Sequence, residues 1–557
     1  MSERFWRHVA GTLAGAGCGA VFGVPSDEPG LVDAAEAAGL AAYPVRDQRS
    51  GASQACGYTR VSGLPSVLAL SSGPSFLNSL AGVSEAASLG TPLVVVTTRV
   101  PASGIGRGGF QDLDQRSVAT PLVSWTYTVE RPEDVGWALR RAVSLATSTR
   151  PSVTVVELTD EVTRADVPEA EPRALGRAPR SSPCSDDLAR AVDLMRSARR
   201  PLVVAGGGAA GARGPLAGLL ARWGAAGATT SAGRGAIDEH AEMACGLVGL
   251  YATPPLHEVF ASADVILGVG TSWEETATMG WDGLEEARVI HVDRDVTAFG
   301  RSLEPEVALH GDTALTVGEL TRLLGEGPVG TDPDWAPKVR AAVAQASGIL
   351  SLNFDTSRCA ATLQAVRERL PQAFVLAQDN GLHDIWSYHF PLVRVGEGTT
   401  VVGPGEQTVM GHGLAAGVGA SLADRERTTV AVMGDGAFSL SASALATAVE
   451  HGSRLLCVVF DNGGFGWPRL LRTVEGRSPE VTRFGERAAV SDLGRAYGAA
   501  VVTVDTAEDL IKGLDILLDG VHEGRPGLLH VLVDDHDVPP GVARIVGVSS
   551  PQASSRK

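Results

Sequence analysis

The chain has 557 residues with a formal net charge of -17, and 44% of its residues are hydrophobic. This length is too great for one hydrophobic core, and the composition is typical of soluble globular proteins rather than disordered ones. The acidic balance argues against partners such as nucleic acid or an anionic membrane surface, which reward clustered Lys and Arg. No run of about 18 apolar residues predicts a membrane span. Six scattered cysteines without a CxxC pair indicate a reducing compartment, so we expect a cytoplasmic protein.

Short runs of β-branched residues alternate with Ala-rich stretches, which is the pattern of parallel α/β domains. The segment FWRHVAGTLAGAG, at 5–17, predicts a first helix that leads into a buried strand at 20–24. Basic residues before an apolar run also fit a signal peptide. We favour the helix, because the strand continues into a Pro turn. Further strands are expected at 65–72, 92–98 and 152–158.

Two more groups of strands follow along the chain. They are expected at 201–208, 264–270 and 288–293, and then at 373–379, 428–436, 455–462 and 527–535. Polar stretches rich in Pro and Gly separate the groups and predict linkers. The sequence therefore predicts an α/β fold of three doubly wound parallel-sheet domains of ordinary size: domains at 1–168, 187–326 and 353–540, linkers at 169–186 and 327–352, and a tail at 541–557.

The segment with most chemical information runs from 430 to 466, VAVMGDGAFSLSASALATAVEHGSRLLCVVFDNGGFG. One predicted strand ends at Asp435, and the next ends at Asn462, so both side chains lie at the carboxyl edge of one parallel sheet, where open α/β sheets bind ligands. Their oxygens, with a nearby backbone carbonyl, suit Mg²⁺ shared with phosphate groups. The flanking glycines let backbone amides approach a phosphate closely.

Asp435 and Asn462 are 27 residues apart, with a complete strand-helix-strand unit between them. This segment resembles the diphosphate-binding signature of thiamine-diphosphate enzymes, in the superfamily of acetolactate synthase, benzoylformate decarboxylase and benzaldehyde lyase. The likeness extends over nearly the whole chain, through VFGVPS, ACGYTRVSG, GGFQDLDQ, PLVVAGGG, DNGLHDIW and VMGHGLAAGVGA.

The resemblance implies a pyrimidine-binding first domain, a central domain and a diphosphate- and Mg²⁺-binding third domain. It also implies that the cofactor lies between the first domain of one subunit and the third domain of another. A homodimer is then the minimum, and a homotetramer is expected. The implied partners are a small 2-oxo acid donor and a carbonyl acceptor.

The resemblance also assigns roles to single residues. Asp435, Asn462 and the Gly464 carbonyl would hold Mg²⁺; Met410 would wedge thiamine diphosphate into a bent shape, and the Thr408 carbonyl would accept from its 4'-amino group. Leu382 stands where the synthases tend to carry Gln, which puts one diphosphate contact in doubt. The full implied cofactor-binding set is Asn380, Gly381, His383, Thr408, Met410, Gly434, Asp435, Gly436, Ala437, Asn462, Gly464 and Phe465.

One departure from the family concerns proton chemistry. A Glu normally stands nine residues before the Gly of a Gly-Tyr pair and donates a proton toward N1' of the aminopyrimidine. Here position 48, nine before Gly57, holds Gln48. Its amide can hydrogen-bond but has no titratable proton. Three readings are open: an active enzyme with altered proton economy, a carboxylate supplied by Asp47, or a homologue that binds the cofactor without turnover. We favour the first, because the diphosphate site is nearly complete.

The reaction is inferred from the implied pocket. The loop at 101–112 lacks the His-His pair of pyruvate-type decarboxylases, whereas Phe110 and Gln111 match the synthase and lyase pocket. This favours decarboxylation of a 2-oxo acid with transfer of the acyl anion equivalent to a second carbonyl. The alternatives are a simple decarboxylase, a non-catalytic homologue and, more weakly, an oxidoreductase.

Further pocket candidates lie in two turns. Ser26, Asp27 and Glu28 follow the first strand, where they fit either substrate contact or helix capping. Trp467 and Leu471 begin a predicted helix over the pocket, and Leu471 falls where plant acetolactate synthases carry a substrate-discriminating Trp. A specialised biosynthetic carboligase therefore fits better than housekeeping acetolactate synthesis. In the synthases the central domain binds FAD, but AGGG here lacks a full GxGxxG, so the sequence disfavours FAD.

Overall fold

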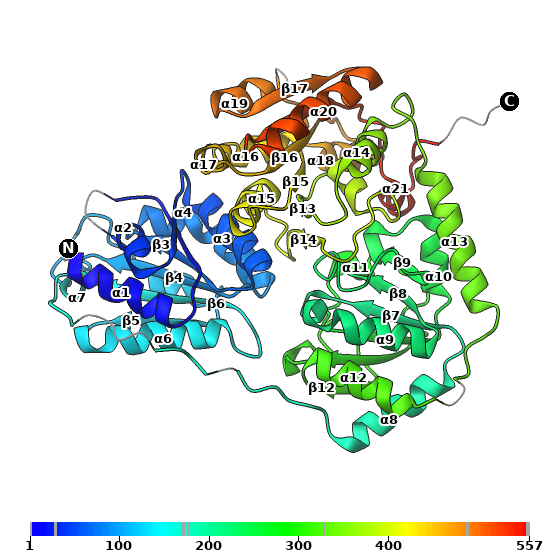
Figure 1. Cartoon of the computed structure of the whole chain (residues 1–557), viewed down its shortest axis with the longest axis horizontal. Coiled ribbons are helices and arrows are strands. Elements are labelled where there is room, and N and C mark those ends of the chain that lie inside the picture. The colour runs from blue at the N-terminus through cyan, green and yellow to red at the C-terminus, as the bar shows by residue number, and fades with distance from the viewer. Residues whose placement is uncertain are drawn as a thin grey trace.

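The computed structural model describes residues 3–26, 30–168, 173–176, 178–326, 329–485 and 489–552. It contains three sheets of six strands, and every pairing within them is parallel. Helices cover the sheets, as Figure 1 shows for the blue-to-cyan, green and yellow-to-red parts of the chain. The predicted α/β fold class with three parallel sheets is confirmed.

The first sheet has the strand order β2-β1-β3-β4-β6-β5. The four inner strands, β1, β3, β4 and β6, are largely buried and apolar, as expected where helices cover both faces of a sheet, whereas the edge strands β2 and β5 are only partly buried. The strands are β1 (Ala20–Gly23), β2 (Ala41–Pro44), β3 (Ser66–Leu70), β4 (Leu93–Arg99), β5 (Trp125–Val129) and β6 (Val153–Thr159). The helices are α1 (Glu3–Gly15), α2 (Leu31–Ala35), α3 (Gln48–Ser62), α4 (Pro74–Ser88), α5 (Gln115–Ala119), α6 (Val135–Ala146) and α7 (Asp160–Thr163).

The central sheet has the order β12-β11-β10-β7-β8-β9. In chain order this is the doubly wound pattern of dinucleotide-binding domains, with its switch point between β7 and β10. The strands are β7 (Pro201–Ala205), β8 (Ala226–Thr229), β9 (Ala244–Leu247), β10 (Val265–Val269), β11 (Arg288–Asp293) and β12 (Val307–His310). The helices are α8 (Ser185–Ser197), α9 (Arg213–Trp223), α10 (Pro254–Ala261), α11 (Glu275–Thr278), α12 (Thr313–Leu324) and α13 (Trp335–Leu350).

The third sheet has the order β14-β13-β15-β16-β18-β17, which repeats the order of the first sheet. The strands are β13 (Val375–Gln378), β14 (Thr400–Val402), β15 (Thr429–Gly434), β16 (Leu455–Asp461), β17 (Ala500–Val504) and β18 (Gly527–Leu532). The helices are α14 (Arg358–Arg369), α15 (His412–Ala423), α16 (Asp435–Ser441), α17 (Ala444–Glu450), α18 (Gly466–Val474), α19 (Val490–Ala496), α20 (Ala507–His522) and α21 (Pro540–Val546).

The structure differs from the sequence prediction at two joins. The stretch predicted as a linker at 327–352 contains α13, which buries Trp335, Val339 and Ala346 in the apolar cluster of the central domain. The stretch predicted as a tail at 541–557 begins within α21, whose Val542 and Ala543 pack against Leu250 and its neighbours. Helices α13 and α21 form tertiary contacts that local composition does not reveal.

The third domain makes close contacts with both of the others. Helices α3 and α15 pack with their backbones in close contact: a Cβ at Gly57 would lie 1.8 Å from the Ala416 carbonyl oxygen, and one at Gly419 would lie 1.8 Å from the Gln54 carbonyl oxygen. Glycine is required at such an approach. Elsewhere, Arg234 of the central domain is fully buried against Glu239 and donates to two carbonyls of the third domain.

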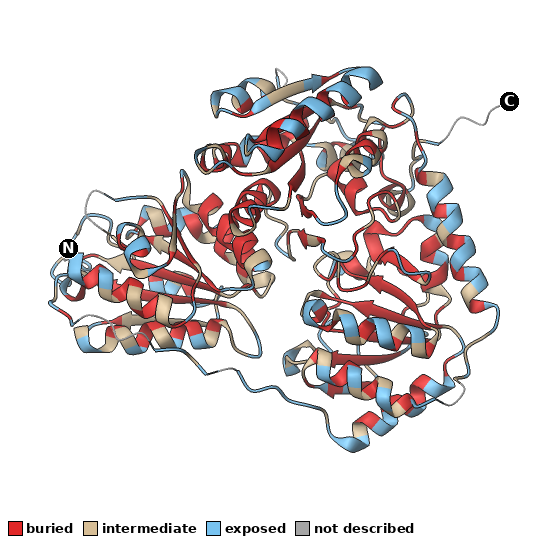
Figure 2. Ribbon diagram, in the orientation of Figure 1, coloured by how far each residue is buried: buried red, intermediate tan, exposed pale blue. Residues whose placement is uncertain are grey.

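Figure 2 shows that the inner strands of the sheets and the α3–α15 contact are largely buried, whereas the outer helices expose one face. Within the described residues, no helix has the length and apolar character needed to cross a membrane.

Candidate active site

The predicted Mg²⁺ ligands lie together at the carboxyl edge of the third sheet. β15 and β16 are paired up to Gly434 and Phe460, so the residues that follow both strands emerge side by side. The Gly464 N–H donates to Asp435 Oδ2 at 2.9 Å, which joins the two turns directly. Asp435 and Asn462 are buried there.

The charge at this edge fits a cation. Burial and the neighbouring Asp461 raise the pKa of Asp435 to about 7. Within the described residues, no cluster of three or more His, Cys, Asp or Glu side chains is arranged to hold a metal ion. Ligation of Mg²⁺ here therefore needs amide and carbonyl oxygens beside Asp435, which is the set that the sequence predicts.

The loop from Asn462 to Gly464 is braced by residues that the sequence did not single out. The buried Arg469 of α18 donates to the carbonyls of Asn462 and Gly463, at 2.9 and 3.1 Å, and pairs with Asp535. Asp461 accepts from the Gly463 N–H, and its other oxygen lies 2.8 Å from His530 Nε2. The pKa of Asp461 is lowered by its hydrogen bond to His530, against the effect of burial. The sequence did offer one signal of this bracing: Arg469 lies close to the predicted metal loop, where a cationic side chain is unexpected.

The turn after β13 contacts the start of α15. The buried Asp379 accepts from the backbone N–H groups of Gly411 and Gly413, at 3.2 and 2.7 Å, and of Asn380. Thr408 has φ +46°, in the left-handed region. This network fixes the segment that presents Thr408 and Met410.

Four of the predicted cofactor residues line one cavity of about 890 Å³: Asn380, Gly381, Thr408 and Met410. Trp467, predicted as a substrate-pocket residue, lines the same cavity. A Cβ at Gly436 would lie 3.1 Å from the Phe465 ring and 3.4 Å from the Met410 methyl, so this glycine also lies beside Met410. Ala437 is buried under it in α16. The predicted cofactor residues of the third domain are therefore brought together.

The neighbouring residues His383 and Leu382 differ in their contacts. His383 is buried, with Nε2 3.1 Å from the Asp534 carbonyl oxygen, and its Cε1 would lie 3.5 Å from a Cβ at Gly466. Burial lowers the pKa of His383. Leu382 packs in an apolar cluster instead and offers no polar contact.

Other predicted residues lie away from this cavity. Phe110 is 86% exposed, and Gln111, at φ +64°, packs its backbone on Gly73. Ser26 is exposed after β1, and Asp27 and Glu28 lie outside the described residues. Leu471 is half-buried in α18 and is not part of the cavity wall. A single chain thus does not gather all the predicted residues.

Gln48 opens α3 next to two polar neighbours. Asp47 caps the helix by accepting from the Ser50 N–H at 2.8 Å. Asn78 of α4 donates to Asp47 Oδ2 at 3.0 Å and to Gln48 Oε1 at 2.7 Å. Both oxygens of Asp47 are therefore engaged, which argues against its serving as the missing acid.

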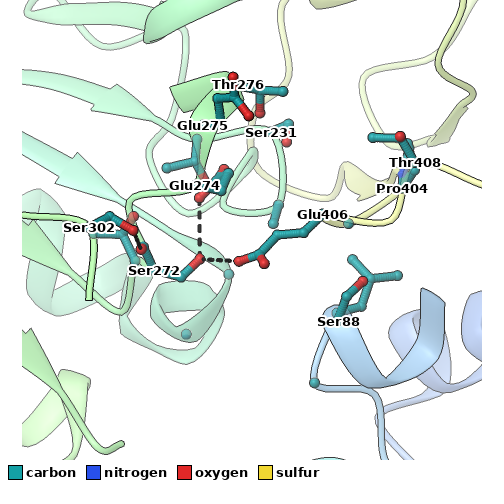
Figure 3. Close-up of a pocket in the computed structure, with 18 of the residues that line it drawn as sticks. Ser88, Ser231, Ser272, Glu274, Glu275, Thr276, Ser302, Pro404, Glu406 and Thr408 are labelled. Atoms are coloured by element: carbon teal, nitrogen blue, oxygen red, sulfur yellow. Dashed lines mark hydrogen bonds between the residues drawn. The ribbon is translucent and has the colours of Figure 1, made fainter. Parts of the chain in front are cut away.

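Most of the rest of the 890 Å³ cavity is formed by the central domain at the switch point of its sheet, with further walls from the first domain and from the third-domain segment that contains Glu406. Figure 3 shows Ser272 between Glu274 and Glu406, to which its hydroxyl donates at 3.4 and 3.1 Å. Burial raises the pKa of Glu274. The glycine turn after β7 uses its amides internally, because Gly206 N–H donates to Val269 and Gly208 N–H to Gly270.

Comparison with known proteins matches all three domains. Residues 4–118, 188–320 and 379–531 match the N-terminal thiamine-pyrophosphate-binding, central and C-terminal thiamine-pyrophosphate-binding domains of thiamine pyrophosphate enzymes. The chain is 29% identical to a "Probable 2-ketoarginine decarboxylase" of Pseudomonas aeruginosa, over 90% of this chain and 89% of that one. It is 26% identical to an acetolactate synthase large subunit of Escherichia coli, over 94% of each chain. It is 24% identical to a "Probable acetolactate synthase large subunit" of Methanococcus aeolicus, over 89% and 87%. The chain belongs to the thiamine pyrophosphate enzymes.

Proposed function

We propose that this protein is a thiamine-diphosphate- and Mg²⁺-dependent carboligase of specialised metabolism. It decarboxylates a 2-oxo acid and joins the remaining acyl unit to a second carbonyl compound. The observation that carries this proposal is the edge of the third sheet, where Asp435, Asn462 and Gly464 meet close to Met410.

Each residue at this edge has a binding task. Asp435, Asn462 and the Gly464 carbonyl hold Mg²⁺, and Asn380, Gly381 and His383 line the diphosphate. Gly434, Gly436 and Ala437 would keep the backbone close to it, while Phe465 and Met410, which lie beside Gly436, would hold the rest of the cofactor. Bound thiamine diphosphate supplies an electron sink for cleavage and formation of carbon–carbon bonds.

Ligation is favoured over simple decarboxylation by the polar groups of the first domain. The segment 101–112 carries Gln111 and no histidine. A neutral amide can orient a carbonyl acceptor without delivering a proton, whereas an imidazole would protonate the reacting carbon. Simple 2-oxo acid decarboxylation is the second candidate, supported by the relative whose name is a 2-ketoarginine decarboxylase.

The site is completed by a second copy of the chain in this proposal. Gln48, Phe110 and Gln111 do not belong to the wall of the cavity that Met410 lines. The apolar side chains of Leu77 and Leu440, 47% and 40% exposed, lie near Gln48: Leu77 precedes Asn78, and the Leu440 carbonyl accepts from Arg49. A homodimer, or a homotetramer built from it, would cover this surface in the cytoplasm.

FAD is not part of the proposed enzyme. The amides of Gly206 and Gly208 are donated within the fold and are not free to bind a diphosphate. Of the three arginines that line the cavity, Arg150, Arg294 and Arg301, two are paired: Arg150 with Asp295 and Arg301 with Glu406. The purified protein should therefore be colourless.

The test is the rate of C2-H/D exchange of thiamine diphosphate bound with Mg²⁺, followed by acid quench and proton NMR. It requires no knowledge of the substrate. Exchange faster than that of free thiamine diphosphate is expected, and screening of 2-oxo acids with aldehyde acceptors then separates ligation from aldehyde release. Exchange no faster than that of the free compound, with binding verified by titration, would refute an active resting enzyme and favour a non-catalytic homologue.

A further inference from the structure

The side chain of Gln48 has a defined orientation, which follows from its neighbours. Asn78 Nδ2 lies 3.0 Å from Asp47 Oδ2 and 2.7 Å from Gln48 Oε1. An ionised carboxylate only accepts hydrogen bonds. Asp47 therefore fixes which end of the Asn78 amide faces it, namely the NH₂ group.

The second N–H of Asn78 then fixes Gln48. An NH₂ group needs an acceptor, so the oxygen of the Gln48 amide has to face Asn78, and its own NH₂ group has to face away. The orientation of a side-chain amide is ordinarily assigned from its hydrogen-bond network. Here that network includes the Asp47 carboxylate, whose two oxygens both accept, so its side of the network has only one arrangement. Asp47 is itself held at the start of α3 by the Ser50 N–H at 2.8 Å.

We propose that Asn78 is a positioning residue which, anchored by Asp47, turns Gln48 so that it presents an N–H donor to N1' of the aminopyrimidine of thiamine diphosphate. This rests on the proposed function. The donor matches an unprotonated N1', which accepts, and does not match a protonated N1', which donates. The chain thereby replaces delivery of a proton by a fixed hydrogen bond that selects the neutral aminopyrimidine.

The test compares the affinities for thiamine diphosphate and for an analogue in which N1' is replaced by C–H, each with saturating Mg²⁺, by calorimetric titration. The wild-type chain should bind thiamine diphosphate about 2- to 10-fold more tightly than the analogue, as expected for one hydrogen bond. Asn78→Leu should bring the ratio close to one. Asp47→Asn keeps a good helix cap but removes the fixed acceptor, so it should lower the ratio without unfolding α3.

Two further features keep the test decisive. Ser84→Ala, on the same helix, removes only a hydroxyl that donates to the Ala81 carbonyl and should leave the ratio at its wild-type value. The wild-type preference should also weaken as the pH falls and N1' becomes protonated, and this pH dependence should be lost in Asn78→Leu. A merely structural role for Asn78 would lower both affinities together.

The outcomes distinguish the two proposals. If the wild-type chain binds neither compound, the proposed function is refuted. If it binds both equally, or if Asn78→Leu and Asp47→Asn both keep the wild-type ratio, the orientation of Gln48 is refuted while the proposed function stands.

Discussion

The substitution Gly57→Ala tests the contact between α3 and α15. The added Cβ would lie 1.8 Å from the Ala416 carbonyl oxygen, whereas real Cβ atoms essentially never approach within 3.0 Å. The obstacle is backbone, so no side chain can turn aside. The two helices would have to separate by more than about 1 Å, which forfeits a quarter to a half of the dispersion energy across the contact.

The expected cost follows from two opposing effects. Ala favours a helix interior over Gly by about 1 kcal/mol. Overpacking of a tight interior costs about 1–3 kcal/mol, and a backbone obstacle belongs at the upper end or beyond it. The net loss should be about 2 kcal/mol or more, which lowers the Tm by about 4–8 °C for a domain of this size. Because α3 starts at Gln48 and α15 starts just after Met410, affinity for thiamine diphosphate should fall as well.

The assay is thermal unfolding followed by circular dichroism, with Gly218→Ala as the matched control. Gly218 also lies inside a helix, α9, but a Cβ there would meet nothing within 4 Å. The control should be about 0.5–1 kcal/mol more stable than the wild type. A Gly57→Ala variant with the wild-type Tm, or a control that is destabilised equally, would refute the reasoning.

Three further changes probe charge. Burial and Asp379 raise the pKa of Asp384 to about 8. Between about pH 4 and pH 8 the folded chain therefore holds a proton that the unfolded chain has released. The free energy of unfolding then falls as the pH rises. Asp384→Asn should remove a slope of about 1.4 kcal/mol per pH unit, seen in Tm values between pH 5 and 7; an unchanged slope would contradict it. Arg234→Met leaves Glu239 buried without its partner and should cost about 3–5 kcal/mol in thermal unfolding, partly recovered by adding Glu239→Gln. Asp435→Ala should weaken Mg²⁺-dependent binding of thiamine diphosphate more than about 100-fold by calorimetry, while Mg²⁺-independent binding would count against the metal assignment.

The sequence predicted the parts of the fold that carry a strong local signal. Long Val- and Leu-rich strands such as β4 and β16 were found, because their apolar runs are bounded by turns. The short strands β8, AGAT, and β9, ACGL, were missed. Both consist mostly of Ala and Gly, so they show neither an alternation of apolar and polar residues nor a run of β-branched ones. α13 was taken for part of a linker because it follows a stretch rich in Pro and Gly, but its own Pro337 lies in the first turn, where a helix tolerates Pro.

The same contrast applies to the site. Asp435 and Asn462 were predictable because one strand-helix-strand unit brings them to the same sheet edge. Asn78 was not, because nothing in the sequence relates α4 to the start of α3 thirty residues earlier. Arg469 was missed although it lies close to the metal loop in sequence. The sequence does not reveal that its guanidinium donates to the backbone carbonyls of that loop.

The reciprocal glycine contact implies an internal two-fold relationship. The first and third sheets share one strand order, and α3 and α15 each follow the second strand of their sheet. The contact is reciprocal. The Gln54 carbonyl of α3 lies against Gly419 of α15, and the Ala416 carbonyl of α15 lies against Gly57 of α3. Such self-complementary exchange is what a dimer of identical subunits shows at its axis. Here the two halves lie on one polypeptide, so the fold is consistent with an ancestral duplication in which each copy has since taken one half of the cofactor site.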